Sequence, residues 1–201
     1  MDSRLHSRHL QSNFYIKYMI HKTLIITLFL VFTTTWSQVE TADNDSQKTK
    51  NVELYREIFW NNPVNDKKWV TDYEKLYTDD QKAELNTIID NFEKETSFEI
   101  AIVTIDTLKV SREKFEDLSL HIAKTWGVGK RYKDNGILIA ISDGYRKMRI
   151  QNGNGIERIL TDEETQLIVD NYFIPEFKKG SYFNGTLVGL KEIIRVLKSK
   201  M

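Results

Sequence analysis

The chain has 201 residues, 29 basic and 29 acidic side chains, and 40% hydrophobic residues. This length suffices for one globular domain of ordinary size with an extension. The balanced charge gives no sign of a strongly basic face, so we expect no nucleic-acid partner. The chain contains no cysteine, which excludes disulfides, thiolate zinc sites and cysteine nucleophiles.

Residues 1–37 differ in character from the rest. A basic flank precedes the apolar stretch LIITLFLVF, which is too short for a membrane-spanning helix of about 20 residues. Small polar residues follow, so the pattern predicts a secretory signal peptide, with a start at Met19 and cleavage near Ser37/Gln38. We therefore expect a periplasmic or extracellular protein without a stable transmembrane anchor in its mature form. A buried core helix or an uncleaved amphipathic anchor is the alternative.

The mature chain begins with a polar leader over residues 38–65, which we expect to be partly disordered. Within it, Tyr55, Phe59 and Trp60 have the spacing of a short helix that packs on the domain. The folded domain is expected over residues 66–201.

The first predicted helix is TDDQKAELNTIIDNFEKET, which opens with a capping box formed by Thr78 and Gln81. FEIAIVTI (98–105) and GILIAIS (136–142) are apolar and β-branched, as expected of strands covered on both faces. A helix with an apolar stripe lies between them, over residues 111–126.

Asp143-Gly144 predicts a hairpin, so that a strand over 147–152 returns antiparallel. A second capping box at Thr161 begins a helix that Pro175 is expected to end. The last helix starts near Tyr182. This order predicts an α/β fold, a three-layer α/β/α sandwich with a small mixed central sheet, and we expect a monomer.

Polar residues gather where the predicted hairpin returns the chain. Asp134 and Asn135 precede the second strand, and QNGNGIE, with Asn154 and Glu157, follows the third at the same edge of the sheet. Asp162 begins the next helix nearby. Such oxygen-bearing side chains in glycine-rich turns suit a divalent cation, Ca²⁺ more readily than Mg²⁺. The alternative is that they are turn, capping and solvated residues.

Recognised catalytic motifs are absent: the sequence has no P-loop, no G-x-S-x-G and no H-E-x-x-H. His121 is the only histidine after residue 37, and its place in a helix is typical of a surface side chain. Arg146, Lys147 and Arg149 form either a phosphate clamp or a solvated strand face.

Several blocks in order resemble the TPM domain family over about residues 66–198. They are VTDYEKLYTDDQKAEL, FEIAIVTIDTL, TWGVGKRYKDNGILIAIS, KMRIQNGNGIERILTDEE and IPEFKKGSYFNGTLVGLKEI. The resemblance implies an α/β/α sandwich, divalent-ion binding and, in some relatives, acid phosphatase activity. The family's aspartate before the first helix corresponds to Asp72, and its G-x-G-x-E turn to Gly153, Gly155 and Glu157. Asn154 stands where the family commonly has an aromatic residue.

Our first hypothesis is an exported domain that binds a divalent cation, calcium preferred, as a binding or assembly module. The residues expected to bind the metal are Asp72, Asp134, Asn135, Glu157 and Asp162, with Asp106, Asp143 and Asn154 as secondary candidates. The alternative is a metal-assisted acid phosphatase that acts on phosphomonoesters. A third possibility is an adaptor for an envelope protein that requires no ion.

Overall fold

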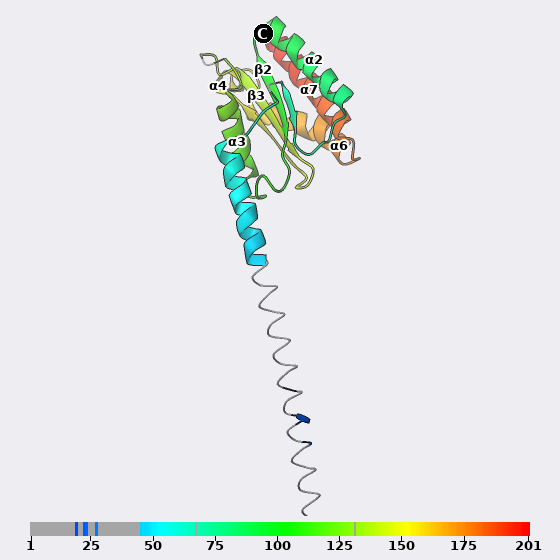
Figure 1. The fold of residues 1–201 in the computed structure, drawn as a ribbon. Coiled ribbons are helices and arrows are strands. Elements are labelled where there is room, and N and C mark those ends of the chain that lie inside the picture. The colour runs from blue at the N-terminus through cyan, green and yellow to red at the C-terminus, as the bar shows by residue number, and fades with distance from the viewer. Residues whose placement is uncertain (1–18, 20–21, 24–26, 28–44, 67, 131) are drawn as a thin grey trace, which may run out of the picture. The chain divides into compact units, whose positions relative to one another are not determined.

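The computed structural model describes residue 19, residues 22–23 and 27, and then residues 45–66, 68–130 and 132–201 (Figure 1). The signal segment and cleavage point expected from the sequence lie outside the described residues, apart from those isolated positions. In the described part of the chain, no helix is long and apolar enough to cross a membrane. The chain divides into two units, Met1–Glu53 and Leu54–Met201. Residues 45–53 of the first unit are helical, and the fold below is that of the second.

Four strands form one mixed sheet in the order β1-β2-β3-β4. Their bounds are β1 (Val70–Asp72), β2 (Glu99–Thr104), β3 (Gly136–Ser142) and β4 (Lys147–Asn152). The strands β1, β2 and β3 run parallel, and β4 is antiparallel to β3. The hairpin and the mixed sheet are as predicted. The sequence did not predict β1, because a strand of three residues is too short to show an alternating pattern.

The helices α2, α3, α5 and α7 follow the predicted order, whereas the sequence did not predict the short helix α4. Their bounds are α2 (Asp79–Thr96), α3 (Phe115–Trp126), α4 (Asn154–Glu157), α5 (Asp162–Ile168), α6 (Ile174–Phe177) and α7 (Tyr182–Lys200). Both predicted capping boxes are formed, Thr78 with Gln81 and Thr161 with Glu164. In each box two N–H groups of the first turn find acceptors without help from the rest of the fold.

Side chains alternate between the two faces of the sheet and build two hydrophobic cores. Ile100 and Ile102 of β2 pack on the side of α2, α5 and α7, whereas Ala101 and Val103 pack on the side of α3. Every residue of β3 is buried. Figure 1 shows α2 and α7 on one side of the sheet and α3 on the other. The three-layer α/β/α sandwich is therefore confirmed.

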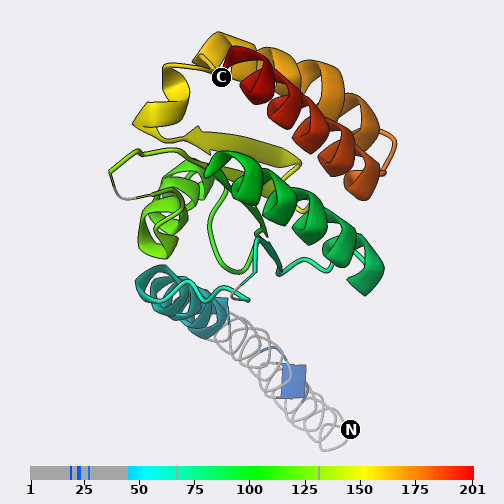
Figure 2. The ribbon, with the colours of Figure 1, turned by 90° about the horizontal axis from the view of Figure 1, so that it is seen from above.

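Residues 54–63 are here called the strap, and they complete the layer that contains α3 (the cyan segment in Figure 2). The ring of Phe59 is buried and meets the ring of Tyr73 edge-on at 5.2 Å between centroids. Trp60 stacks on the imidazole of His121 at 4.4 Å, and a ring nitrogen of this histidine lies 2.8 Å from the carbonyl oxygen of Trp60. The packing predicted for this segment is confirmed.

Pro175 does not end the preceding helix, contrary to the prediction. After α5 the chain continues through a π-helical turn (Val169–Phe173) into α6, which has the proline in its first turn. A proline lacks the N–H group that an interior helical residue donates, but a first turn does not need that donor. The helical path ends near Gly180, whose φ of +77° is in the left-handed region.

Candidate functional site

The loops before β3 and after β4 are held against each other at the amino edge of the parallel strands. The N–H of Gly153 donates to the carbonyl oxygen of Gly136 at 2.9 Å, and that of Gly155 to the carbonyl oxygen of Asp134 at 3.0 Å. A Cβ atom on Gly155 would lie 2.0 Å from the carbonyl oxygen of Lys133. These glycines therefore permit the close approach of the two loops, and the proximity predicted from the hairpin is confirmed.

A pocket of about 870 Å³ opens beside these loops, and Asp134, Asn154 and Glu157 line it together. All three side chains are exposed to solvent. The amide nitrogen of Asn154 lies 3.5 Å from a carboxylate oxygen of Asp134. We refer to Asp134, Asn154 and Glu157 as the amino-edge site. It presents two carboxylates and one amide on a surface that solvent reaches.

Asn135 is placed beside this site but is engaged elsewhere. Its side chain is buried, and the side-chain oxygen Oδ1 accepts the backbone N–H of Lys130 at 2.8 Å. Its amide nitrogen donates to the carbonyl oxygen of Ser97 at 2.7 Å. Because these bonds tie the loop to the end of α2, the side chain of Asn135 has a structural role. Asp162 lies exposed in the first turn of α5 and does not line the pocket.

The structure does not bring Asp72 together with Asp134. Asp72 is the last residue of β1 and pairs with Thr104 at the carboxyl end of β2. Gly136, which follows the loop of Asp134, pairs with Glu99 at the amino end of the same strand. Five residues of strand separate the two ends, or roughly 16 Å. A single metal site cannot include both carboxylates.

The carboxylate of Asp72 orders the turn that leads into α2. It accepts the hydroxyl of Thr104 at 2.6 Å and the N–H groups of Leu76 and Tyr77 at 3.1 and 2.9 Å. These bonds use both of its oxygens. The family's aspartate therefore has a clear role in holding the chain between β1 and α2.

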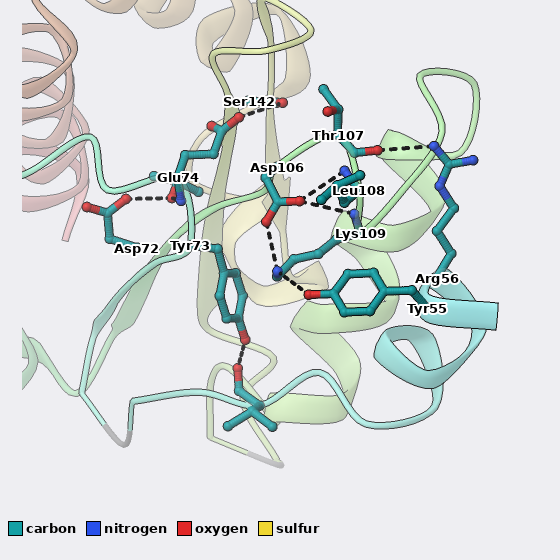
Figure 3. Close-up of polar contacts among 12 residues, drawn as sticks. Tyr55, Arg56, Asp72, Tyr73, Glu74, Asp106, Thr107, Leu108, Lys109 and Ser142 are labelled. Carbon is teal, nitrogen blue, oxygen red and sulfur yellow. Dashed lines mark hydrogen bonds and ion pairs between the residues drawn. The ribbon is translucent and has the colours of Figure 1, made fainter. Parts of the chain in front are cut away.

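Glu74 is a carboxylate at the carboxyl edge that no motif of the sequence marks. It accepts the N–H groups of Asp143 and Gly144 at 2.9 and 3.2 Å. It also accepts the hydroxyl of Ser142 at 3.3 Å (Figure 3). Burial raises the pKa of Glu74 above its usual value, and it outweighs the lowering by these hydrogen bonds. The side chain thus fixes the β3–β4 turn. Asp143 itself is exposed in that turn.

Asp106 belongs to a separate network (Figure 3). One carboxylate oxygen accepts two N–H groups of the following turn, and the other pairs with the ammonium of Lys109 at 2.7 Å. That ammonium also lies over the rings of Tyr55, Phe59 and Tyr73, at 5.3, 5.3 and 4.7 Å from their centroids. Asp106 therefore helps to hold the strap, and its carboxylate is already paired with the ammonium of Lys109.

The fit of these groups to a metal ion differs between the two edges. Within the described residues, no group of three or more Asp, Glu, His or Cys side chains could hold a metal ion. The amino-edge site offers only oxygen atoms, which is the ligand type that Ca²⁺ prefers, but fewer than the six to eight that it takes. Water would have to supply the remaining ligands. The donor atoms are therefore of the type that calcium prefers, but they are too few for tight binding, so they fit a weakly held calcium ion.

The fold and the amino-edge site define an α/β/α sandwich domain with its polar pocket where a hairpin returns the chain. A family model described as TPM domain matches residues 70–196, which is more than half of the chain. The protein belongs to the TPM domain family. Among curated proteins, none matches the chain significantly.

Two solved structures place the fold in a wider context. The N-terminal domain of a protein from P. gingivalis, determined by NMR, is 27% identical, with a TM-score of 0.60 and coverage of 70% of this chain and 87% of that one. The BA42 protein of the psychrophilic bacterium Bizionia argentinensis is 21% identical, with a TM-score of 0.56 and coverage of 64% and 86%. At this identity the likeness to BA42 concerns the fold alone.

Proposed function

We propose that the protein is a calcium-binding TPM domain that acts as a binding or assembly module, with the ion held at the amino-edge site. The observation that carries the proposal is the convergence of Asp134, from the loop before β3, with Asn154 and Glu157, from the short helix α4, on one pocket. The side-chain chemistry of that pocket is oxygen-only and carries two negative charges. Asp72, Asn135 and Asp162 are not part of the proposed site.

The proposed affinity follows from the number of ligands. Tight calcium sites use several carboxylates in a closed loop, whereas modules with few charged ligands bind with dissociation constants of about 10⁻⁴–10⁻³ M. The two exposed carboxylates support an affinity in the weaker class. A site of this kind is filled only where calcium is abundant, which agrees with the export predicted from the N-terminal sequence.

Calorimetric titration with CaCl₂ tests the proposal. The purified protein should bind one ion with a dissociation constant of about 10⁻⁴–10⁻³ M. Glu157→Gln and Asp134→Asn each remove one charge with little change in shape and should weaken binding by at least about tenfold. Asp162→Asn removes an equally exposed charge outside the pocket and should leave binding unchanged. Equal effects of all three variants would contradict a defined site.

A metal-assisted phosphatase remains the second candidate, with less support from the geometry. Such a reaction needs a cation beside the phosphate and a nucleophile or a metal-bound water. Among the described residues that line the amino-edge pocket, Lys124 is the only cation. His121 is engaged with Trp60 on the strap. If the activity exists here, hydrolysis of a simple phosphomonoester should require calcium or magnesium and should fail in Glu157→Gln.

A further inference from the structure

A second pocket, of about 620 Å³, lies at the carboxyl edge of the sheet, between the β3–β4 turn and the connection from α6 to α7. Four of its lining residues are cationic: Arg146, Lys147, Lys178 and Lys179. Its apolar lining comes from Met148, Ile174 and Phe177. A pocket of this size that combines apolar side chains with convergent polar groups suits a small organic ligand.

The charges of this pocket are not all neutralised by the protein. Lys179 pairs with Glu176 at 2.6 Å. Neither Arg146 nor Lys178 has a carboxylate within 4.0 Å in the part of the chain that the structure describes. The pocket contains one carboxylate, Asp143. Within the described residues, Arg146 and Lys178 therefore border this pocket without an ion pair, and Asp143 is the only acidic residue that lines it.

The acidic side chain is itself engaged. The pKa of the Tyr182 hydroxyl is raised to about 12 by burial and by its hydrogen bond to the Asp143 carboxylate. Tyr182 therefore stays protonated at neutral pH. This hydrogen bond reduces the repulsion that an anionic ligand would meet from Asp143.

Arg146 has a backbone that an arginine rarely adopts. Its φ is 49°, in the left-handed region, and its N–H donates to the carbonyl oxygen of Asp143 at 2.9 Å to close the turn. Glycine or asparagine is the common choice at such a position, and a longer side chain costs about 1 kcal/mol. The turn adopts this conformation despite its cost, and Arg146 is one of the residues that line the pocket. The ammonium of Lys147 is directed elsewhere, to the carbonyl oxygen of Arg112 at 3.2 Å.

The apolar wall is aromatic where it meets the cations. The rings of Phe177 and Tyr182 lie 4.8 Å apart, and Phe177 also packs against Phe173 at 6.0 Å. A flat apolar group would find an aromatic ring in the same pocket as Lys178. A guanidinium and an ammonium at the rim would meet a phosphate or carboxylate on that group.

We propose that this pocket, lined by Arg146, Lys178 and the Phe177 ring, binds a small organic anion that has an apolar body and one phosphate or carboxylate group. The site lies at the opposite edge of the sheet from the amino-edge site and does not depend on calcium. Its ligand is held at two points, by charge at the rim and by apolar burial at the wall. A bare inorganic anion or a neutral aromatic compound satisfies only one of these.

An NMR titration with phenyl phosphate tests the proposal, with inorganic phosphate and benzyl alcohol as matched probes. Phenyl phosphate should shift amide signals of residues 143–148 and 174–182 and should bind at least about fivefold more tightly than either partial probe, because the ring is buried as well. Binding should weaken as the salt concentration rises. Equal affinity for all three probes, or shifts located elsewhere, would overturn the proposal.

Variants identify the cations responsible. Arg146→Gly places the residue preferred at this φ and should fold at least as well, yet weaken phenyl phosphate binding by about threefold or more. Lys178→Gln should have a similar effect. Arg149→Gln and Lys191→Gln remove equally exposed positive charges outside the pocket and should leave binding nearly unchanged. A double variant Arg146→Gly/Lys178→Gln that still binds with native affinity would exclude this site.

Discussion

The strap offers the sharpest test of what stabilises this domain, because Phe59 and Ile58 are neighbours on the same helix with opposite environments. The Phe59 side chain is 8% exposed, whereas that of Ile58 is 60% exposed. Phe59→Ala removes a ring from the core on the α3 side of the sheet. Ile58→Ala shortens a side chain of the same helix that solvent already surrounds.

The expected loss can be worked out from the contacts. Replacement of a buried phenylalanine by alanine costs about 3–5 kcal/mol when the cavity cannot collapse. The edge-on contact with Tyr73 at 5.2 Å contributes about 0.5–1.5 kcal/mol of this. Since the strap lies at the end of the chain's folded unit and can adjust, we expect the lower end, about 3 kcal/mol. For a domain of this size that corresponds to a melting temperature lower by about 6–12 °C.

Urea unfolding of the purified protein, followed by far-UV circular dichroism, measures both variants. We expect the free energy of unfolding to fall by about 3 kcal/mol in Phe59→Ala and by less than about 0.5 kcal/mol in Ile58→Ala. The two variants thus differ mainly in burial. If Phe59→Ala loses less than about 1 kcal/mol, or no more than Ile58→Ala, the strap is not an integral part of the fold and our reasoning on the core is refuted.

Two further predictions concern the loops and the pH dependence. Gly155→Ala should lower the free energy of unfolding by several kcal/mol, because its Cβ would lie 2.0 Å from the carbonyl oxygen of Lys133. Gly180→Ala has open space around its Cβ and should lose only about 1 kcal/mol, because of its positive φ. Similar losses for the two variants in thermal denaturation would contradict this prediction. Carboxyl ¹³C NMR should give Glu74 a pKa above its usual value and Glu164, which pairs with Lys200, a pKa below it. Because Glu74 binds its proton more tightly in the folded state, its contribution to stability should be present at low pH and be lost as the pH rises through its folded pKa. A normal or lowered pKa for Glu74 would contradict the assigned burial.

The sequence predicted those parts of the fold that local chemistry determines. Thr78 and Thr161 each cap a helix by bonds within four residues, so their patterns suffice without tertiary information. The apolar runs of β2 and β3 likewise contain their own signal. β1 has only three residues, and its strand conformation depends on pairing with β2. For Pro175, no pattern in the sequence indicates the π-helical turn that precedes it and through which the helical path continues.

The candidate site was predictable only in part, for related reasons. The hairpin fixed the edge of the sheet to which Asn154 and Glu157 belong, so their meeting with Asp134 could be expected. Asp72 could not be assigned to an edge while β1 was unrecognised. Asn135 has the right chemistry for a ligand, but its burial and its two hydrogen bonds follow from how the loop packs on α2.

The carboxyl-edge pocket was beyond sequence reasoning altogether. The sequence groups Arg146 with Lys147 and Arg149, its neighbours along the chain, as a phosphate clamp or a solvated strand face. In the folded protein the ammonium of Lys147 turns toward α3, and the companions of Arg146 are Lys178 and Lys179, from a distant connection. Residues far apart in the sequence meet in this way because of how the β3–β4 turn lies against the connection from α6 to α7. Such proximity produces no periodic pattern in the sequence.

The central claim, that calcium binds at the amino-edge site, is tested most directly by a residue-resolved NMR titration of the protein with CaCl₂. The account predicts that amide signals of Asp134, Asn154 and Glu157 shift together with one dissociation constant of about 10⁻⁴–10⁻³ M, and that this constant rises by at least about tenfold in Glu157→Gln. Signals of Asp72 at the opposite edge should stay unchanged. Absence of any response up to about 10 mM calcium, or a response centred on Asp72, would contradict the claim.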